Sequence, residues 1–139
     1  MYQILFHILL YDIWYYMLHV FLHKNIYFVH KCHHLKSYNK LTFLDTYEGD
    51  IIEKPIQLIS IIIPYYLPNS NLYTFMYFCI IIIMRDLLKH DHRCVWLTGN
   101  HHILHHKHPK YNFGEYWIDT LCGTKYPNQD AYIYGLIYV

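Results

Sequence analysis

Three short histidine motifs constrain this chain more than any other feature. The first motif is His19 and His23, the second is His30, His33 and His34, and the third is His102, His105 and His106. A helix turns by about 100° per residue, so side chains three and four positions apart share one face. We therefore predict that each motif presents its imidazoles together on one helical face.

These motifs predict a site for two metal ions. Imidazole binds iron, zinc and copper, and one ion takes only four to six ligands, fewer than the motifs supply. His90, which follows Asp86 by four residues, is predicted as a ninth ligand. His92 and His101 are weaker candidates. His92 lies about 200° around its helix from His90, and His101 lies about 100° from the face of the third motif. We expect His101 and His108 to be dispensable for metal binding. The alternative, a histidine-rich tract without a metal, does not explain three motifs with helical spacing.

Composition limits the class of protein. The chain of 139 residues is predicted to form one all-α domain, 1–139, and its net charge of +1 argues against nucleic-acid binding. Hydrophobic residues make up 55% and aromatic residues 19%, which is typical of membrane interfaces. The mean hydropathy of +0.06 is low for a membrane protein. We attribute this value to the many histidines and tyrosines.

Two apolar regions are predicted to enter a membrane. Residues 2–22 lack Gly and Pro and are long enough for a membrane-crossing helix. Residues 55–67 and 72–84 form two shorter arms around the turn residues Pro68–Asn71, and whether this hairpin spans the bilayer is left open. Neither 1–23 nor 55–84 contains Lys or Arg, so the positive-inside rule places the histidines on the cytosolic side. No signal peptide is expected.

Asp12 lies on the first apolar segment, on one stripe with Tyr16, His19 and His23. A carboxylate at that depth needs a partner. Two roles are open: a hydrogen bond that orients a ligand imidazole, or a hydrogen bond between helices. The cysteines form no Cys-x-x-Cys pair, so we expect free thiols at Cys32, Cys79, Cys94 and Cys122.

The chain resembles the fatty acid hydroxylase/sterol desaturase superfamily of membrane-bound, histidine-rich enzymes. The resemblance covers about residues 10–127 and rests on the three histidine motifs in order, on Asp12-Ile-Trp-Tyr-Tyr16, and on the ending Asn112-Phe-Gly-Glu-Tyr-Trp-Ile-Asp119-Thr-Leu-Cys-Gly-Thr124. Cys122 stands where that ending has Phe. The resemblance implies membrane helices under a cytosolic helical cap that holds two iron ions, for which zinc could substitute. Asp12, Asp86 and Asp119 would orient ligand histidines.

The implied activity is O2-dependent hydroxylation or desaturation of a lipid, fatty acyl or sterol C–H bond. Electrons would come from a small haem carrier or its reductase, and in a eukaryote the membrane would be that of the endoplasmic reticulum. Relatives usually carry further helices before the first motif, so we expect a partner or a second copy to supply them. Two alternatives stay open: an inactive metal-binding membrane paralogue, and a zinc-dependent Lewis-acid enzyme. No Glu-x-x-His motif of the ferritin-like di-iron kind is present.

Overall fold

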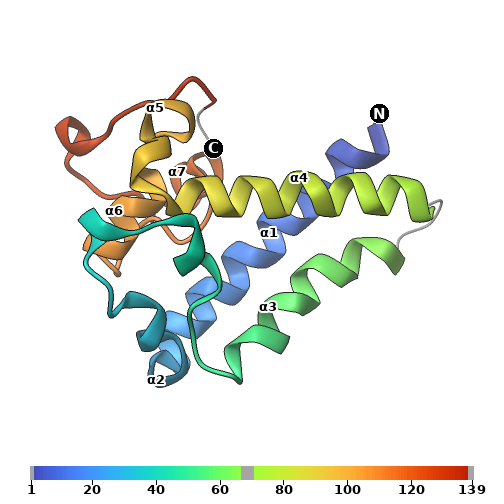
Figure 1. The fold of residues 1–139 in the computed structure, drawn as a ribbon, viewed down its shortest axis with the longest axis horizontal. Coiled ribbons are helices and arrows are strands. Elements are labelled where there is room, and N and C mark those ends of the chain that lie inside the picture. The colour runs from blue at the N-terminus through green and yellow to red at the C-terminus, as the bar shows by residue number, and fades with distance from the viewer. Residues whose placement is uncertain (1, 67–70, 138–139) are drawn as a thin grey trace.

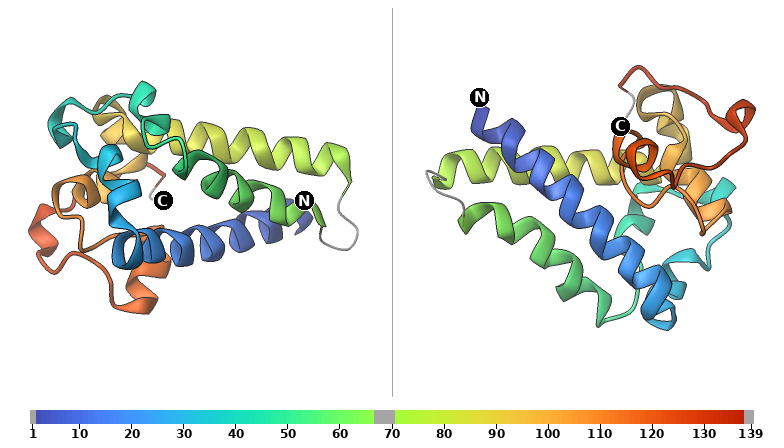
Figure 2. Two further views of the ribbon diagram at one scale, coloured as in Figure 1. Left: turned by 90° about the horizontal axis from the view of Figure 1, so that it is seen from below. Right: turned by 180° about the vertical axis from the view of Figure 1, so that it is seen from behind.

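The computed structural model describes residues 2–66 and 71–137, and over these ranges all regular structure is helical, as predicted. Three helices, α1 (Tyr2–Asn25), α3 (Glu53–Ile62) and α4 (Leu72–His90), extend from one end of the molecule. Short helices form a cap at the other end (Figures 1 and 2). They are α2 (Tyr27–His30), η1 (Lys31–His34), η2 (Tyr38–Lys40), η3 (Phe43–Tyr47), η5 (His92–Cys94), α5 (Val95–Thr98), α6 (His101–Lys107), α7 (Tyr116–Cys122) and η6 (Gln129–Ala131).

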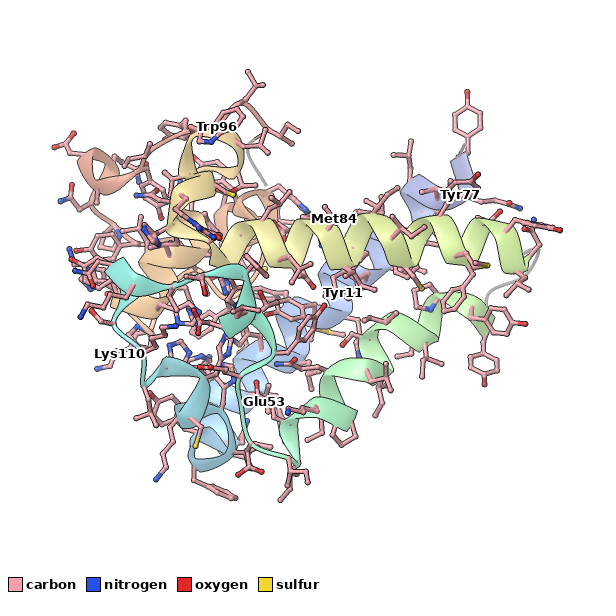
Figure 3. All side chains as sticks on the ribbon, viewed as in Figure 1. Tyr11, Glu53, Tyr77, Met84, Trp96 and Lys110 are labelled. Carbon is pink, nitrogen blue, oxygen red and sulfur yellow. The ribbon has the colours of Figure 1, made fainter. Side chains whose placement is uncertain are left out.

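The long helices expose apolar side chains and bury polar ones. Leu5, Phe6 and Met17 of α1 are exposed, whereas His7 and Asp12 are buried. Along α4, Tyr77 and Met84 are likewise exposed (Figure 3). Among the described helices, α1 is the one long and apolar enough to cross a membrane, in agreement with the segment predicted at 2–22.

The second apolar region folds as two antiparallel helical arms. The first arm is α3 followed by η4 (Ile63–Tyr66), and α4 begins after Asn71, whose side chain accepts a hydrogen bond from the Thr74 amide (2.9 Å). The predicted turn falls partly outside the described residues, since these omit 67–70. The second arm continues past Met84, so His90 ends the same helix that returns from the turn.

A small core joins the three long helices. Tyr11 of α1 packs against Phe78 and Ile82 of α4, with Phe75 and Ile61 at the edge. The rings of Tyr11 and Phe78 meet edge to face, with centroids 6.0 Å apart. Such contacts fix the mutual position of α1, which carries the first histidine motif, and α4, which carries His90 at its end.

Next to this core lies a buried charged network. Arg85 donates to Asp12 (2.6 Å) and lies 3.4 Å from Glu115, while Lys89 donates to Glu115 (2.5 Å) and lies 3.2 Å from Asp86. Asp12 also accepts from the indole Nε1 of Trp117 (3.4 Å). Its partners are therefore a cation on α4 and an indole on α7, so of its two open roles the hydrogen bond between helices is the one observed. The network links α1 and α4 to the start of α7 in the cap.

Candidate metal centre

The structure gathers all nine predicted ligands into two clusters of donor atoms. Within each cluster, one donor atom per residue lies within 4.8 Å of every other. The five-histidine cluster is His19, His23, His30, His34 and His105, and the four-histidine cluster is His33, His90, His102 and His106. The clusters adjoin, because the ring centroids of His34 and His106 are 4.7 Å apart.

The second and third motifs each divide between the two clusters, a division that the helical spacing did not predict. The α-helix of the second motif ends at His30, and the tighter 3-10 turn of Lys31–His34 carries His33 away from His34. On α6, His105 lies about 100° around the axis from His106. Each of these two motifs therefore contributes ligands to both clusters, which keeps the clusters side by side.

Hydrogen bonds at Nδ1 orient the rings so that Nε2 faces inward. Four acceptors are backbone carbonyls that no side-chain pattern could have revealed. His19 donates to Phe113 O (2.5 Å), His33 to Glu48 O (2.9 Å), His90 to Asp86 O (2.8 Å) and His105 to Tyr111 O (2.6 Å). Since a carbonyl oxygen only accepts, these four Nδ1 atoms carry the hydrogen, and each neutral ring presents a bare lone pair at Nε2.

These lone pairs point at one another. Nε2 of His90 is 3.2 Å from Nε2 of His33, and Nε2 of His105 is 3.1 Å from that of His23. Between His33 and His90 both nitrogens are acceptors, so no hydrogen bond forms there and the contact is repulsive unless a cation lies between them. Nitrogens bound at about 2.0–2.1 Å to one ion would be about 3.0–3.4 Å apart, which these distances match.

His106 gives an independent indication that the four-histidine cluster fits a metal ion. Its ring is buried, and neither nitrogen has a hydrogen-bond partner in the described part of the chain. Its centroid lies 4.7 Å from that of His33 and 5.0 Å from that of His102. A buried imidazole without a partner is costly, and a metal ion shared with its neighbours would remove that cost. The residues present therefore fit a bound metal in each cluster.

Burial keeps the imidazoles neutral, the form that binds metals. It lowers the pKa of His30 to about 4, and burial together with neighbouring imidazoles lowers the pKa of His34 to about 2. Burial also holds the pKa of His102, His105 and His106 well below the usual value. Neutral rings can accept a metal without first losing a proton.

Glu53 is a site residue that the sequence did not reveal. Its carboxylate lies 2.6 Å from Nδ1 of His30, and both side chains are almost fully buried. Burial raises the pKa of Glu53 to about 7, partly opposed by His33. Because Glu53 stands nineteen residues or more from every motif and starts an apolar helix, no spacing rule could have identified it. A carboxylate in this position orients a metal-binding imidazole and raises its basicity.

We expect Glu53→Ala to weaken metal binding to the five-histidine cluster by about ten- to a hundredfold, because His30 loses the acceptor at Nδ1. Glu53→Gln keeps an oxygen acceptor and should lose less. Competition with a chelator measures both affinities. Equal affinities for wild type and Glu53→Ala would show that the carboxylate has no influence on the metal.

The remaining predicted site residues lie around the clusters. Asp86 supports His90 through its backbone oxygen, while its carboxylate accepts from Tyr11 (2.8 Å). Asp119 accepts from the amides of Phe113 (3.0 Å) and Gly114 (2.8 Å), and so fixes the loop whose carbonyl holds His19. Neither carboxylate contacts a ligand imidazole in the way expected. Asp86 holds His90 with its backbone oxygen, and Asp119 supports His19 only through the backbone of Phe113.

The two weaker histidine candidates lie outside both clusters. His92 donates to Leu41 O (2.6 Å), and Nε2 of His101 lies 3.0 Å from the Asp119 carboxylate. His108 stacks on Tyr126 with centroids 4.2 Å apart. The cysteines are free thiols, as expected.

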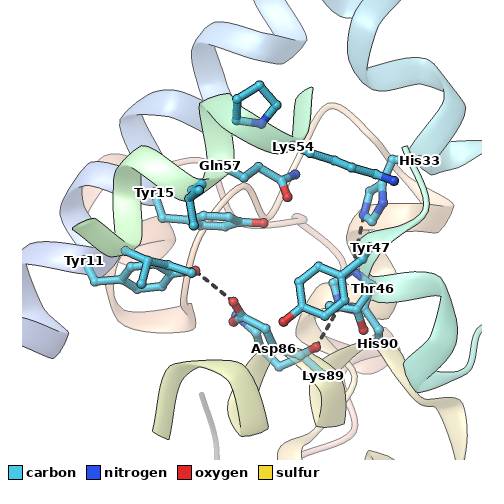
Figure 4. Close-up of a pocket in the computed structure, with 13 residues that line it drawn as sticks. Tyr11, Tyr15, His33, Thr46, Tyr47, Lys54, Gln57, Asp86, Lys89 and His90 are labelled. Atoms are coloured by element: carbon cyan, nitrogen blue, oxygen red, sulfur yellow. Dashed lines mark hydrogen bonds and ion pairs between the residues drawn. The ribbon is translucent and has the colours of Figure 1, made fainter. Parts of the chain in front are cut away.

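A cavity of about 510 Å³ reaches the four-histidine cluster. His33 and His90 line it together with side chains of α1, α3 and α4 (Figure 4). Its walls include Tyr11, Tyr15 and Leu58. No member of the five-histidine cluster is among the described residues that line it. The clusters therefore differ in what they face.

The fold and the site together define an all-helical, histidine-rich protein with an apolar helix and two adjoining clusters able to bind metal. The family model for fatty acid hydroxylases matches residues 4–124, and the chain belongs to this family, which confirms the resemblance. Membership indicates a membrane-associated oxidoreductase and suggests lipid oxidation. No match was found among curated proteins or among solved structures.

Proposed function

We propose that the protein is an O2-dependent di-iron oxidoreductase that hydroxylates or desaturates a lipid, fatty acyl or sterol chain, with the nine clustered histidines as ligands. The observation that carries this proposal is the convergence of the imidazole Nε2 atoms within hydrogen-bond distance, including the His33–His90 pair, in which neither nitrogen has a hydrogen to share. Two bound irons would supply the redox chemistry that cleavage of an unactivated C–H bond by dioxygen requires.

The ligand set favours iron over zinc. Five imidazoles in one cluster exceed the four ligands of a structural zinc site, and a catalytic zinc usually has three protein ligands. Among the described residues the clusters contain only histidines, and no carboxylate oxygen lies inside them as a base for hydrolysis. Imidazole also suits iron, which adds redox capacity.

The chain's own residues would bind and position the substrate. An apolar chain can lie in the cavity against Tyr11, Tyr15, Leu58 and Ile61, where its carbon atoms reach the part of the wall that His33 and His90 form. This placement removes apolar surface from water and keeps bulk water away from the reacting carbon. Exposed Lys54, also on the cavity wall, offers a cation to a polar headgroup.

The proposed orientation follows from charge and exposure. The apolar surfaces of α1, α3 and α4 would face lipid, and the cap with its lysines would face the cytosol, at the endoplasmic reticulum if the source is eukaryotic. A small haem carrier or its reductase would supply electrons from that side. A second copy or another membrane partner would contact the exposed apolar helices.

Cells that express the iron-loaded protein under labelled dioxygen should accumulate labelled hydroxyl groups or new double bonds in their lipids. Lipid mass spectrometry measures both. His92→Ala is the matched control, since it removes a histidine outside both clusters and should leave the products unchanged. Iron-loaded protein that is reduced by its donor yet gives neither product would support an inactive metal-binding paralogue instead.

A further inference from the structure

The cavity beside the four-histidine cluster is not uniformly apolar. Leu58 and Ile61 of α3 form an apolar part of its wall. Tyr15 of α1, Tyr47 of η3 and Asp86 of α4 add oxygen atoms to the wall. A plain hydrocarbon chain matches only the apolar part, whereas a ligand that has both an apolar chain and a polar group matches the whole wall.

Several polar groups of this wall already have partners within the protein. The carboxylate of Asp86 accepts from Tyr11 (2.8 Å) and lies 3.2 Å from the ammonium group of Lys89. The hydroxyl of Thr46 donates to the backbone oxygen of Phe43 (2.8 Å). These hydrogen bonds are internal to the fold, so these groups need no ligand.

The hydroxyl of Tyr15 differs, because it makes no hydrogen bond among the described residues. Figure 4 shows this hydroxyl pointing toward the middle of the cavity. The hydroxyl of Tyr47 has no such partner either, but Tyr47 is exposed and can meet water, whereas Tyr15 is partly buried. A hydrocarbon packed against Tyr15 would leave its hydroxyl unpaired and away from water, which is costly.

Packing fixes the direction of the Tyr15 hydroxyl. The ring of Tyr15 stacks on that of Tyr11, with centroids 5.7 Å apart, and Nζ of Lys89 lies 5.7 Å from the centroid of Tyr15. A side chain held in this way loses little freedom when it binds a ligand. It can therefore discriminate between ligands by one hydrogen bond.

Tyr15 also lies close to the metal-binding imidazoles. It precedes His19 by one turn of α1, and the two ring centroids are 5.3 Å apart. It lines the same cavity as His33 and His90. Since this cavity measures only about 510 Å³, a group held at Tyr15 keeps its neighbouring carbon atoms near these two histidines.

Gln57 supplies an acceptor in the same cavity. Its Nε2 donates to Oε1 of Glu53 (2.6 Å), which orients the carboxamide, and its Oε1 has no partner in the described part of the chain. Together, Tyr15 and Gln57 offer one donor and one acceptor to a ligand in the cavity. An alcohol hydroxyl can satisfy both, because it accepts as well as donates.

We propose that Tyr15 and Gln57 bind a hydroxyl group of the substrate inside the cavity and thereby select a reacting carbon close to that hydroxyl. This inference rests on the proposed function and narrows its substrate to lipids that already carry a hydroxyl group near the oxidised carbon. Tyr15 binds and positions the substrate. It exchanges no electron, and the oxidation itself is the reaction proposed above.

The binding of two matched probes tests this selection. Radiolabelled dodecanol and dodecane are bound to the detergent-purified, iron-loaded protein without an electron donor, and both affinities are measured by scintillation proximity at one detergent concentration. The wild-type protein should prefer the alcohol. Tyr15→Phe should lower the ratio of the two affinities by about three- to tenfold, the usual effect of one neutral hydrogen bond.

Tyr16→Phe is the matched control, because it makes the same chemical change at the next residue of α1. Its hydroxyl lies 3.2 Å from Oγ1 of Thr124, and Tyr16 is not among the described residues that line the cavity. The ratio should stay unchanged in this variant. A disturbance of the fold would weaken the binding of both probes together and leave the ratio as it was. The assignment is overturned by an unchanged ratio in Tyr15→Phe, by an equal fall in Tyr16→Phe, or by a wild-type protein without preference for the alcohol.

The position of oxidation separates failure of this inference from failure of the proposed function. In cells that express the wild-type protein under labelled dioxygen, tandem mass spectrometry should place the new label or double bond close to an existing hydroxyl group. Oxidation found only far from any hydroxyl would overturn the inference and leave the proposed function standing. If no lipid is oxidised, the proposed function fails, while the ratio of probe affinities still decides whether Tyr15 recognises a hydroxyl.

Discussion

A His106→Ala variant is expected to lose the metal of the four-histidine cluster while the metal-free protein keeps nearly all its stability. The side chain of His106 is buried, and neither of its nitrogens makes a hydrogen bond among the described residues. Its removal therefore breaks no side-chain hydrogen bond and removes two buried polar atoms that have no partner. The loss of packing offsets part of this relief. The metal affinity of that cluster should fall by at least about a hundredfold, more than loss of an orienting partner alone would cause.

His101→Ala is the matched control, and it is expected to lower the stability of the protein while leaving its metal content unchanged. His101 is also a buried histidine of α6, but it lies 3.0 Å from Asp119 and outside both clusters. Its replacement should cost about 2–4 kcal/mol of stability through the lost hydrogen bond and the cavity, and should leave two metals per chain. Metal analysis and thermal unfolding with and without a chelator measure both quantities.

The pair of variants separates a metal site from a structural cluster of histidines. If His106→Ala retained both metals at full affinity, the four-histidine cluster would not be a metal site. If His101→Ala lost a metal with its fold intact, the division between ligand and supporting histidines would be wrong.

The sequence predicted the nine clustered histidines because helical spacing is a local property. His102 and His106 share a face whatever the rest of the fold does, and His90 follows from the return of the hairpin. Spacing could not predict which cluster each residue joins. That depends on the 3-10 turn at Lys31–His34 and on where α6 packs, and both are tertiary effects.

The groups that orient the imidazoles were the least predictable part of the site. Most of them are backbone carbonyls, such as Phe113 O and Tyr111 O, and every residue type has one. The sequence correctly predicted that Asp12 has a hydrogen-bond partner, because a buried carboxylate needs one. It did not show whether that partner is an imidazole or Arg85. The helical arms were predictable because apolar composition and turn residues act locally.

The second large effect is expected in the charged network. Three carboxylates, Asp12, Asp86 and Glu115, share two cations, Arg85 and Lys89, so the buried group has a formal excess of one negative charge. Burial alone would raise the pKa of Glu115, but Arg85 and Lys89 lower it to about 2, so this side chain stays ionised. Removing a cation therefore adds to an existing excess, whereas removing a carboxylate relieves it.

Arg85→Gln should accordingly destabilise the protein by about 3–5 kcal/mol, the usual cost of leaving buried charges without a partner. Glu115→Gln should cost clearly less, because the amide oxygen still accepts from Lys89 and the formal charge of the network becomes zero. Thermal unfolding in detergent at neutral pH measures both losses, and unchanged metal content shows that the clusters are intact. Should Glu115→Gln prove the more damaging, the attachment of α7 to α4 would outweigh charge balance, because Glu115 is the one member of the network that belongs to the cap.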